Sequence, residues 1–196
     1  FEAIDPVRGI TNLSSGKMGF ALARAARDAG AEVTLVCGPA SQPTPVGITR
    51  IDVTSAQEMY QAVMQRIGTQ NVFIGVAAVA DYRPATLADH KIKKEDGAPP
   101  AVELVRNPDI LAEVAALPAA PLCVGFAAES RNLAEYAERK RRSKKIPLIV
   151  GNLIQDGFGG DCNAVTLFDD GGQTPLTPGS KLELARAIVA RIATLL

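Results

Sequence analysis

Apolar runs and amphipathic stretches alternate along the whole chain. Short runs rich in Val, Ile and Leu predict β-strands, whereas apolar residues at three- and four-residue spacing predict helices. The predicted strands are 32–37, 48–53, 71–76, 101–105, 122–126 and 148–150, and residues 164–168 and 174–176 flank DDGGQ as a hairpin. The predicted helices are 16–29, 54–67, 108–117, 132–145 and 180–196. This order is typical of an α/β fold with a largely parallel sheet.

Capping residues and loop-forming stretches mark the boundaries of these elements. The expected caps are Gly30 after the first helix, Thr54 or Ser55 with Gln57 and Glu58 at capping-box spacing, Pro108 in a first turn, and Ser180 before the last helix. Loops are predicted at 38–47, which is rich in proline, at 80–100, which is polar and basic, and at 156–161, which is rich in glycine. A loop as long as 80–100 inside a compact domain is usually functional or mobile.

Composition excludes several classes of protein. The chain has 196 residues and a formal net charge of zero, which argues against bulk electrostatic binding of nucleic acid or of an anionic membrane. No apolar run reaches the roughly 20 residues that a membrane-spanning helix needs. Cys37, Cys123 and Cys162 are widely spaced and His90 is the only histidine, which disfavours a disulfide framework or a His/Cys metal site. We therefore expect a cytoplasmic protein with reduced thiols and no nucleic-acid or membrane partner.

The first candidate site is the turn N-L-S-S-G-K-M-G at positions 12–19, which directly precedes a predicted helix. Unpaired backbone N–H groups and the helix dipole make such a turn suitable for an anion. The turn is neither a Walker A loop, because Met18 stands where Ser or Thr would hold magnesium, nor a G-x-G-x-x-G turn. An ordinary capped helix start, with Ser14 or Ser15 as the N-cap, explains the local sequence equally well.

Two further candidates are the segment A-A-V-A-D-Y at 77–82 and the cluster K-I-K-K at 91–94. Ligands of open α/β sheets bind beyond the carboxyl ends of strands, and the small residues after the strand 71–76 leave room for a base or a ribose. Tight helix packing, with Asp81 as a loop cap, is the alternative. The lysine cluster suits a triphosphate or a developing negative charge, although a charge run is more often a solvated surface.

Three more candidates follow predicted strands or lie on a helix. They are N-P-D-I at 107–110, G-F-A-A-E at 125–129, and the pair Lys140 and Lys144, which share one helical face. Each has a plain structural explanation: helix capping, core packing of Phe126, and solvation. Convergence of such sites on one edge of the sheet favours a nucleotide-handling enzyme over a passive module.

Taken together in this order, D-P-V-R-G-I-T-N-L-S-S-G-K-M-G, G-V-A-A-V-A-D-Y-R-P, K-I-K-K, N-P-D-I and V-G-F-A-A-E-S resemble the phosphopantothenoylcysteine synthetase domain of bacterial bifunctional coenzyme A biosynthesis flavoproteins. The resemblance covers essentially the whole chain. It implies a Rossmann-like α/β fold with helices on both faces of the sheet, a homodimer, and a ligase. Such a ligase activates 4′-phosphopantothenate with CTP and Mg²⁺ to an acyl-cytidylate, which cysteine then attacks to release CMP.

The same resemblance assigns roles to individual residues. It implies that Asn12 holds the acyl-cytidylate, that Arg8 helps to bind or form it, and that Lys91 acts mainly in the amine-attack step. It also places phosphates at the turn Ser14, Ser15, Gly16 and Lys17. The implied nucleotide pocket consists of Gly75, Val76, Ala77, Asp81, Lys91, Pro108, Asp109, Ile110, Leu111, Phe126, Lys140 and Lys144. No metal ligands are assigned.

Two departures from the family pattern shape the expected domain organisation. The family normally has a strand and a glycine-rich turn before E-A-I-D-P-V-R, and a decarboxylase domain that carries FMN. We therefore expect residues 1–196 to be a single ligase domain from a longer bifunctional protein, with its first strand missing. The alternatives are an NAD(P)-dependent oxidoreductase of similar fold, which the lack of G-x-G-x-x-G disfavours, and a non-catalytic nucleotide-binding module.

Overall fold

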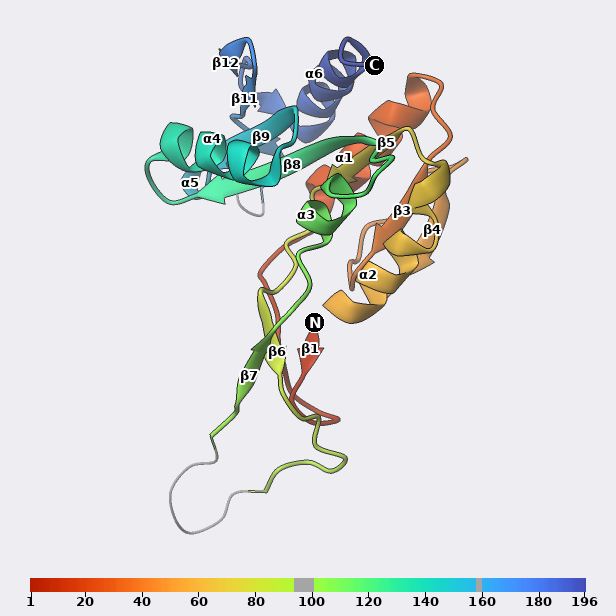
Figure 1. Ribbon diagram of the computed structural model, residues 1–196, viewed down its shortest axis with the longest axis vertical. Helices are drawn as coiled ribbons and strands as arrows, with labels where there is room; N and C mark the ends of the chain where they lie inside the picture. Colours follow the sequence, from red (N-terminus) through yellow and green to blue (C-terminus); the bar gives the residue numbers. More distant parts are fainter. Residues whose placement is uncertain (94–100, 158–159) are drawn as a thin grey trace.

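A computed structural model describes residues 1–93, 101–157 and 160–196. Its centre is a sheet in the order β12-β11-β9-β8-β5, in which β5, β8 and β9 are mutually parallel and β11 and β12 are antiparallel additions. The strands are β5 (Val72–Gly75), β8 (Leu122–Glu129), β9 (Leu148–Leu153), β11 (Thr166–Asp169) and β12 (Gly172–Pro175). Figure 1 shows these strands packed among the helices of an α/β body. The predicted α/β class and the C-terminal hairpin are confirmed.

Helices cover both faces of the sheet. They are α1 (Lys17–Asp28), α2 (Ala56–Met64), α3 (Ile110–Ala115), α4 (Leu133–Lys144), α5 (Ile154–Gly157) and α6 (Lys181–Ala193), with a 3₁₀ turn η1 at Ile67–Thr69. Alternate residues of β8 point to opposite faces: Cys123 packs with α2, α3 and α4, whereas Val124 packs with α1 and α6. The fully buried Leu148 and Ile149 repeat this division on β9. The two-sided packing predicted for the sheet is therefore present.

A second parallel pair, β3 (Thr34–Cys37) and β4 (Thr49–Asp52), is separate from the central sheet in its hydrogen bonding. The predicted strands 32–37 and 71–76 are half-buried rather than buried, because β3 pairs with β4 alone and β5 is an edge strand. An edge strand leaves one side of its backbone without a neighbouring strand.

An arm of short strands extends away from the body (Figure 1). It contains two antiparallel pairs: β1 (Glu2–Ala3) with β2 (Gly9–Ile10), and β6 (Tyr82–Pro84) with β7 (Leu104–Arg106). The first pair contacts the second where β1 meets β6. A further short pair, β10 (Cys162–Asn163) with β13 (Gly179–Ser180), lies before α6. We use the name "arm" for residues 1–10, 82–93 and 101–106.

Several helix caps agree with the sequence. Ser55 with Glu58 and Ser180 with Glu183 both form complete capping boxes. Gly30 has a φ of 94°, and Ala31 N–H donates to Ala26 O at 3.0 Å, as in a Schellman motif. These local signals positioned three helices of the body to within a few residues.

Other expectations were wrong. The loop predicted at 80–100 contains β6, because β6 forms by pairing with the distant β7; residues 94–100 lie outside the described part of the chain. The strand predicted at 101–105 is shifted to Leu104–Arg106, and Pro108 precedes the N-cap Asp109 instead of opening the helix.

The loop predicted at 156–161 begins inside α5, and residues 158–159 are not described. β8 and β9 extend three residues beyond their predicted ends, because they continue to pair with each other.

Candidate functional site

The carboxyl edge of the parallel strands has a step. β5 ends at Gly75, opposite Gly125, whereas β8 continues from Phe126 to Glu129 beside β9. The chain that leaves β5 therefore starts at the carboxyl edge of the sheet, where β8 extends beyond β5. Open α/β sheets bind ligands at this edge. The segment that follows β5 is A-A-V-A-D-Y at 77–82, and its first two residues, Ala77 and Ala78, are exposed.

The turn before α1 reaches this segment. Asn12 Nδ2 donates a hydrogen bond to Ala78 O at 2.8 Å, although the two residues are 66 positions apart. An amide nitrogen carries two hydrogens, so this bond fixes the side chain while leaving donor and acceptor capacity for a ligand. Asn12 and the A-A-V-A-D-Y segment are therefore in direct contact.

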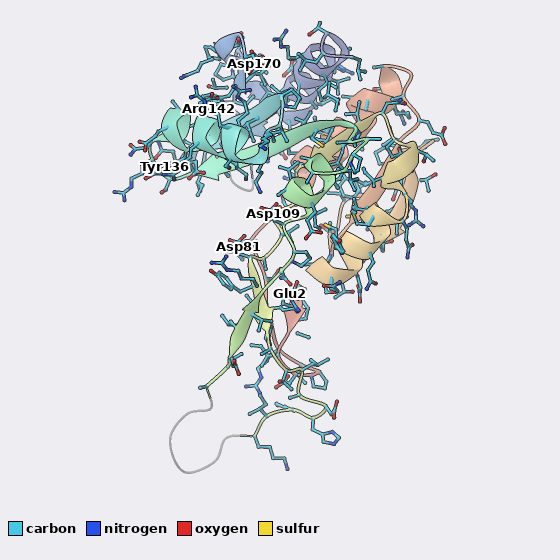
Figure 2. All side chains as sticks on the ribbon, viewed as in Figure 1. Glu2, Asp81, Asp109, Tyr136, Arg142 and Asp170 are labelled. Carbon is cyan, nitrogen blue, oxygen red and sulfur yellow. The ribbon has the colours of Figure 1, made fainter. Side chains whose placement is uncertain are left out.

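The N-P-D-I segment joins the same site through β6 and β7. Asn107 N–H donates to Asp81 O at 2.9 Å, and Asn107 Nδ2 donates to Ala80 O at 2.8 Å. Two residues later, Asp109 caps α3 by accepting from Ala112 N–H at 3.1 Å. Figure 2 shows Asp81 and Asp109 near each other where the arm meets the body. Pro108 lies half-buried between these contacts.

The lysines of α4 complete this group. Lys144 forms an ion pair with Asp109, and Lys140 Nζ donates to Phe126 O at 2.6 Å. Burial raises the pKa of Asp109, but the hydrogen bonds from Lys144 and Ala112 outweigh it and hold that pKa below its usual range. Asp109 therefore stays ionised and keeps Lys144 beside the site.

Several charges converge on Lys140. Burial lowers its pKa, as does the neighbouring Lys144, whereas Asp109, Glu129 and Asp81 raise it. These carboxylates come from three different segments that follow strands. An ammonium that is partly desolvated interacts more strongly with an anionic ligand than a solvated one does. Lys140 is thus well placed to bind a phosphate or an electron-rich base.

A shallow cavity of about 450 Å³ lies against α4. A volume of this size is in the usual range for small-molecule sites. Its lining residues are Glu129, Tyr136, Arg139, Lys140, Ser143 and Lys144. Lys140, Lys144 and Glu129, the last as part of G-F-A-A-E, were candidates from the sequence. Tyr136 and Ser143 lie four and three residues from Lys140, and that helical spacing was a usable signal. The Arg139 guanidinium stacks 4.7 Å from the centre of the Tyr136 ring.

The turn at the start of α1 is not the serine-capped helix start that was the simplest explanation of its sequence. The N-cap is Gly16, in the left-handed conformation at φ 73°, and no side chain caps the helix. Ser14 Oγ and Ser15 Oγ accept only long bonds from Gly16 and Lys17 N–H, at 3.4 and 3.5 Å. The expectation that a serine is the N-cap is therefore wrong. Lys17 pairs with Asp161 at 2.6 Å.

Arg8 and Lys91 lie in the arm instead of beside the cavity on α4. Arg8 pairs with Asp5, and its Nη2 donates to Ile92 O at 2.9 Å. Lys91 and Lys93 are exposed, whereas Lys94 of the same cluster is outside the described residues. The resemblance groups Lys91 with the nucleotide pocket, but the structure places it on a different element.

Part of the expected nucleotide set belongs to the core. Ile110 and Leu111 are buried, and Leu111 packs so closely that a Cβ at Gly75 would lie 3.5 Å from its Cδ1. Phe126 and Val76 are half-buried against the core on the other face of the sheet. The side chains of Ile110 and Leu111 are therefore part of the core beneath the start of α3, and a ligand at the surface would meet their backbone groups.

Among the described residues, no three His, Cys, Asp or Glu side chains gather in a way that would hold a metal ion. Within the same ranges, no helix is long and apolar enough to cross a membrane. The three cysteines are free, with Cys37 and Cys123 buried and Cys162 exposed.

Comparison with known proteins gives this geometry a context. The sequence model of one protein family, the DNA/pantothenate metabolism flavoprotein C-terminal domain, matches residues 1–196. The chain belongs to this family. The family membership agrees with the resemblance inferred from the sequence motifs.

Relatives named coenzyme A biosynthesis bifunctional protein CoaBC align with the whole domain. The protein from Vibrio vulnificus (strain YJ016) is 50% identical over 100% of this chain and 50% of its own length. The protein from Escherichia coli (strain K12) is 49% identical over 98% of this chain and 49% of its own length. The chain thus spans about half the length of the curated relatives that it matches.

Solved structures share the fold. A crystal structure of the C-terminal domain of CoaBC has a TM-score of 0.84 and 40% identity, and the match covers 99% of this chain and 89% of that one. A Cab2 variant in complex with phosphopantothenate-cysteine has a TM-score of 0.77, with 97% of this chain and 82% of that one covered. Its identity is 15%, so that likeness concerns the fold alone.

Proposed function

We propose that this domain ligates 4′-phosphopantothenate to cysteine after activating the carboxylate with CTP. The observation that carries the proposal is the Asn12–Ala78 bond, which joins two family motifs at the carboxyl edge of the sheet. Relatives about 50% identical carry the name of a coenzyme A biosynthesis protein. An acyl-cytidylate needs cations for its phosphate and a donor where oxyanion charge develops, and this edge supplies both.

We assign the nucleotide to the space between A-A-V-A-D-Y and α4. Lys144 is paired with Asp109 at its border, and the charges of Asp81 and Asp109 act on Lys140. Mg²⁺ enters with the triphosphate, whose oxygens supply ligands that a carboxylate cluster would otherwise provide. The turn from Ser14 to Lys17 binds a phosphate through backbone N–H groups at the start of α1.

Activation and amide formation use different residues in this proposal. Asn12 holds the acyl-cytidylate, Arg8 helps to form it, and Lys91 serves the attack by the cysteine amine. The thiol-bearing amine must be deprotonated to attack, and a nearby ammonium stabilises the negative charge that develops at the acyl oxygen. Excluding water protects the activated intermediate from hydrolysis.

We also propose a homodimer that forms through the arm. Large apolar side chains are exposed along it and in the adjoining turn: Val7, Leu13, Tyr82, Leu87, Val102 and Leu104. Exposed apolar side chains gathered in one region are typical of protein interfaces. We further propose that the domain works in the cytoplasm within a bifunctional protein, whose other half carries the FMN-dependent decarboxylase.

Pyrophosphate release tests the proposed reaction. The purified domain is incubated with 4′-phosphopantothenate, Mg²⁺ and either CTP or ATP, with and without cysteine. We expect pyrophosphate with CTP, and CMP together with the amide only when cysteine is present. Absence of pyrophosphate under all conditions would favour the non-catalytic nucleotide-binding module instead.

A further inference from the structure

The turn between β1 and β2 contains a carboxylate that is fully buried although the arm around it is thin. Asp5 has a side-chain exposure of 0%, whereas its ion-pair partner Arg8 is 52% exposed. Asp5 Oδ1 accepts hydrogen bonds from Val7 N–H and Arg8 N–H, both at 2.9 Å. These bonds close a local turn, as an aspartate side chain often does.

The other carboxylate oxygen reaches a distant part of the chain. Asp5 Oδ2 accepts from Arg8 Nε at 3.1 Å and from Ile92 N–H at 3.1 Å, across 87 residues of sequence. Arg8 Nη2 in turn donates to Ile92 O at 2.9 Å. Both backbone groups of Ile92 are therefore held by the Asp5–Arg8 pair, and Lys91 is the adjacent residue.

A second bond holds the same segment. Ala88 N–H donates to Ile4 O at 3.1 Å, so the chain is attached to the β1–β2 turn on both sides of Lys91. The Lys91 side chain itself is exposed. The backbone is therefore held at Ala88 and Ile92, before and after Lys91, while the Lys91 side chain faces solvent.

The chemistry of Asp5 excludes a role in proton transfer. Hydrogen bonding by Arg8 lowers its pKa, against the effect of burial, and the N–H groups of Val7, Ile92 and Arg8 lower it further. A lowered pKa leaves the carboxylate without a proton to donate and makes it a weak base. What it can do is keep its donors in place.

We propose that Asp5 is a positioning residue that holds Lys91 in place through the Ile92 backbone, so that it serves amide formation more than activation. The inference rests on the proposed function, because it needs two separable half-reactions. It distinguishes Asp5 from a residue that only stabilises the arm, because loss of general stability would impair both half-reactions together.

The substitution Asp5→Asn separates the two sets of bonds. The amide oxygen can still accept from Val7 and Arg8 N–H, so the local turn is kept. The amide NH₂ faces the Arg8 guanidinium and Ile92 N–H, which are themselves donors, so the bond to Ile92 is lost. Asp28→Asn is the matched control, because Asp28 pairs with Arg27 near the end of α1, away from the arm.

The experiment is a rapid quench with labelled CTP on the purified protein, with and without cysteine, for wild type, D5N, K91Q and the double variant D5N/K91Q. We expect D5N to form amide about 10- to 100-fold more slowly, as for loss of a hydrogen bond to a charged group. Acyl-cytidylate formation should slow less, because Arg8 loses its carboxylate partner but keeps its charge and its bond to Ile92 O. Because Asp5 acts through Lys91 in this proposal, the double variant should form amide no more slowly than K91Q does. D28N should match wild type in both steps.

Equal loss of both half-reactions in D5N, or multiplied losses in the double variant, would overturn the proposal. If D5N does not fold, Ile92→Pro removes the N–H that Asp5 accepts, and its ring also fixes φ at position 92 and restricts the backbone of Lys91. I92P should therefore slow amide formation at least as much as D5N, and normal amide formation in I92P would equally overturn the proposal. A wild-type protein that releases no pyrophosphate would instead refute the proposed function and leave the Asp5–Ile92 bond to be tested by amide hydrogen exchange. In that test, D5N should speed exchange at Ile92 but not at Ile149.

Discussion

The body and the arm of this protein are stabilised in different ways. The body has a core on each face of its sheet, with residues such as Ile149 and Ile188 fully buried. The arm has strands of two or three residues, exposed apolar side chains, and buried carboxylates at Glu2 and Asp5. Packing over a large area makes the body rigid, whereas the arm depends on a few directional bonds. In the proposed function, the body binds the nucleotide, and the arm carries Lys91 for amide formation together with Arg8 for activation.

The largest expected effect is on the stability of the body. Ile149→Ala removes a fully buried side chain from the middle of β9 and should lower the free energy of unfolding by about 2–5 kcal/mol. Leu104→Ala, at 47% exposure in the arm, should change it by no more than about 0.5 kcal/mol. Urea unfolding at low protein concentration measures both. Equal losses would mean that arm and body are one cooperative unit held by the same packing.

Asn12→Asp should break the connection between the turn before α1 and the segment that follows β5. A carboxylate there repels the developing negative charge and lacks the N–H that Ala78 O accepts. Loss of one such donor typically lowers turnover by about 100–1,000-fold. Steady-state release of CMP with cysteine present measures the effect, and Asn71→Asp, at an exposed position just before β5, is the control. Normal turnover in the Asn12 variant would remove Asn12 from the site.

CTP should stabilise the body, and NADH should not. A ligand that binds only the folded state raises stability by about 2.7 kcal/mol at a concentration 100 times its dissociation constant. Thermal unfolding with each ligand in turn measures this. Equal or greater stabilisation by NADH would revive the oxidoreductase alternative, for which the described residues offer no dinucleotide-binding turn.

The smallest effect is electrostatic and lies on α4, which carries Lys140 and Lys144. Hydrogen bonds from Arg141 and Arg142 lower the pKa of Glu138 to about 2. A depressed pKa stabilises the fold above the ordinary value of 4.5, and that contribution is lost as the pH falls towards 2. Glu138→Gln should therefore lower Tm at pH 7 more than Glu135→Gln does, with a difference that disappears between about pH 4.5 and 2. A constant difference across that range would exclude these ion pairs as its cause.

The sequence predicted the body better than the arm, for physical reasons. Long periodic stretches such as 17–28 report on burial directly, and capping signals such as Ser55 with Glu58 are local. β6 contains Pro84 and forms only by pairing with β7, so no local pattern revealed it. Asp5 was visible as part of D-P-V-R, but its bond to Ile92 spans 87 residues and required the structure.

The candidate site shows the same division. A motif at the end of a parallel strand led to Asp81, whereas Asn12 and Asp109 came from motifs at predicted helix starts and from the family resemblance. The roles assigned by resemblance to Leu111 and Ile110 did not reveal that their side chains are buried in the core. Nor did they separate Lys91, in the arm, from Lys140 on α4.

A rapid-quench comparison of Lys91→Gln with wild type tests the division of labour between body and arm most directly. Labelled CTP is mixed with each protein and 4′-phosphopantothenate, with or without cysteine, and Lys145→Gln serves as a control for loss of an exposed charge. The account predicts that the Lys91 variant still forms acyl-cytidylate, which accumulates or hydrolyses, while little amide appears. Failure to form any intermediate would assign Lys91 to activation, and amide formation at the normal rate would show that the lysine cluster is only a solvated surface.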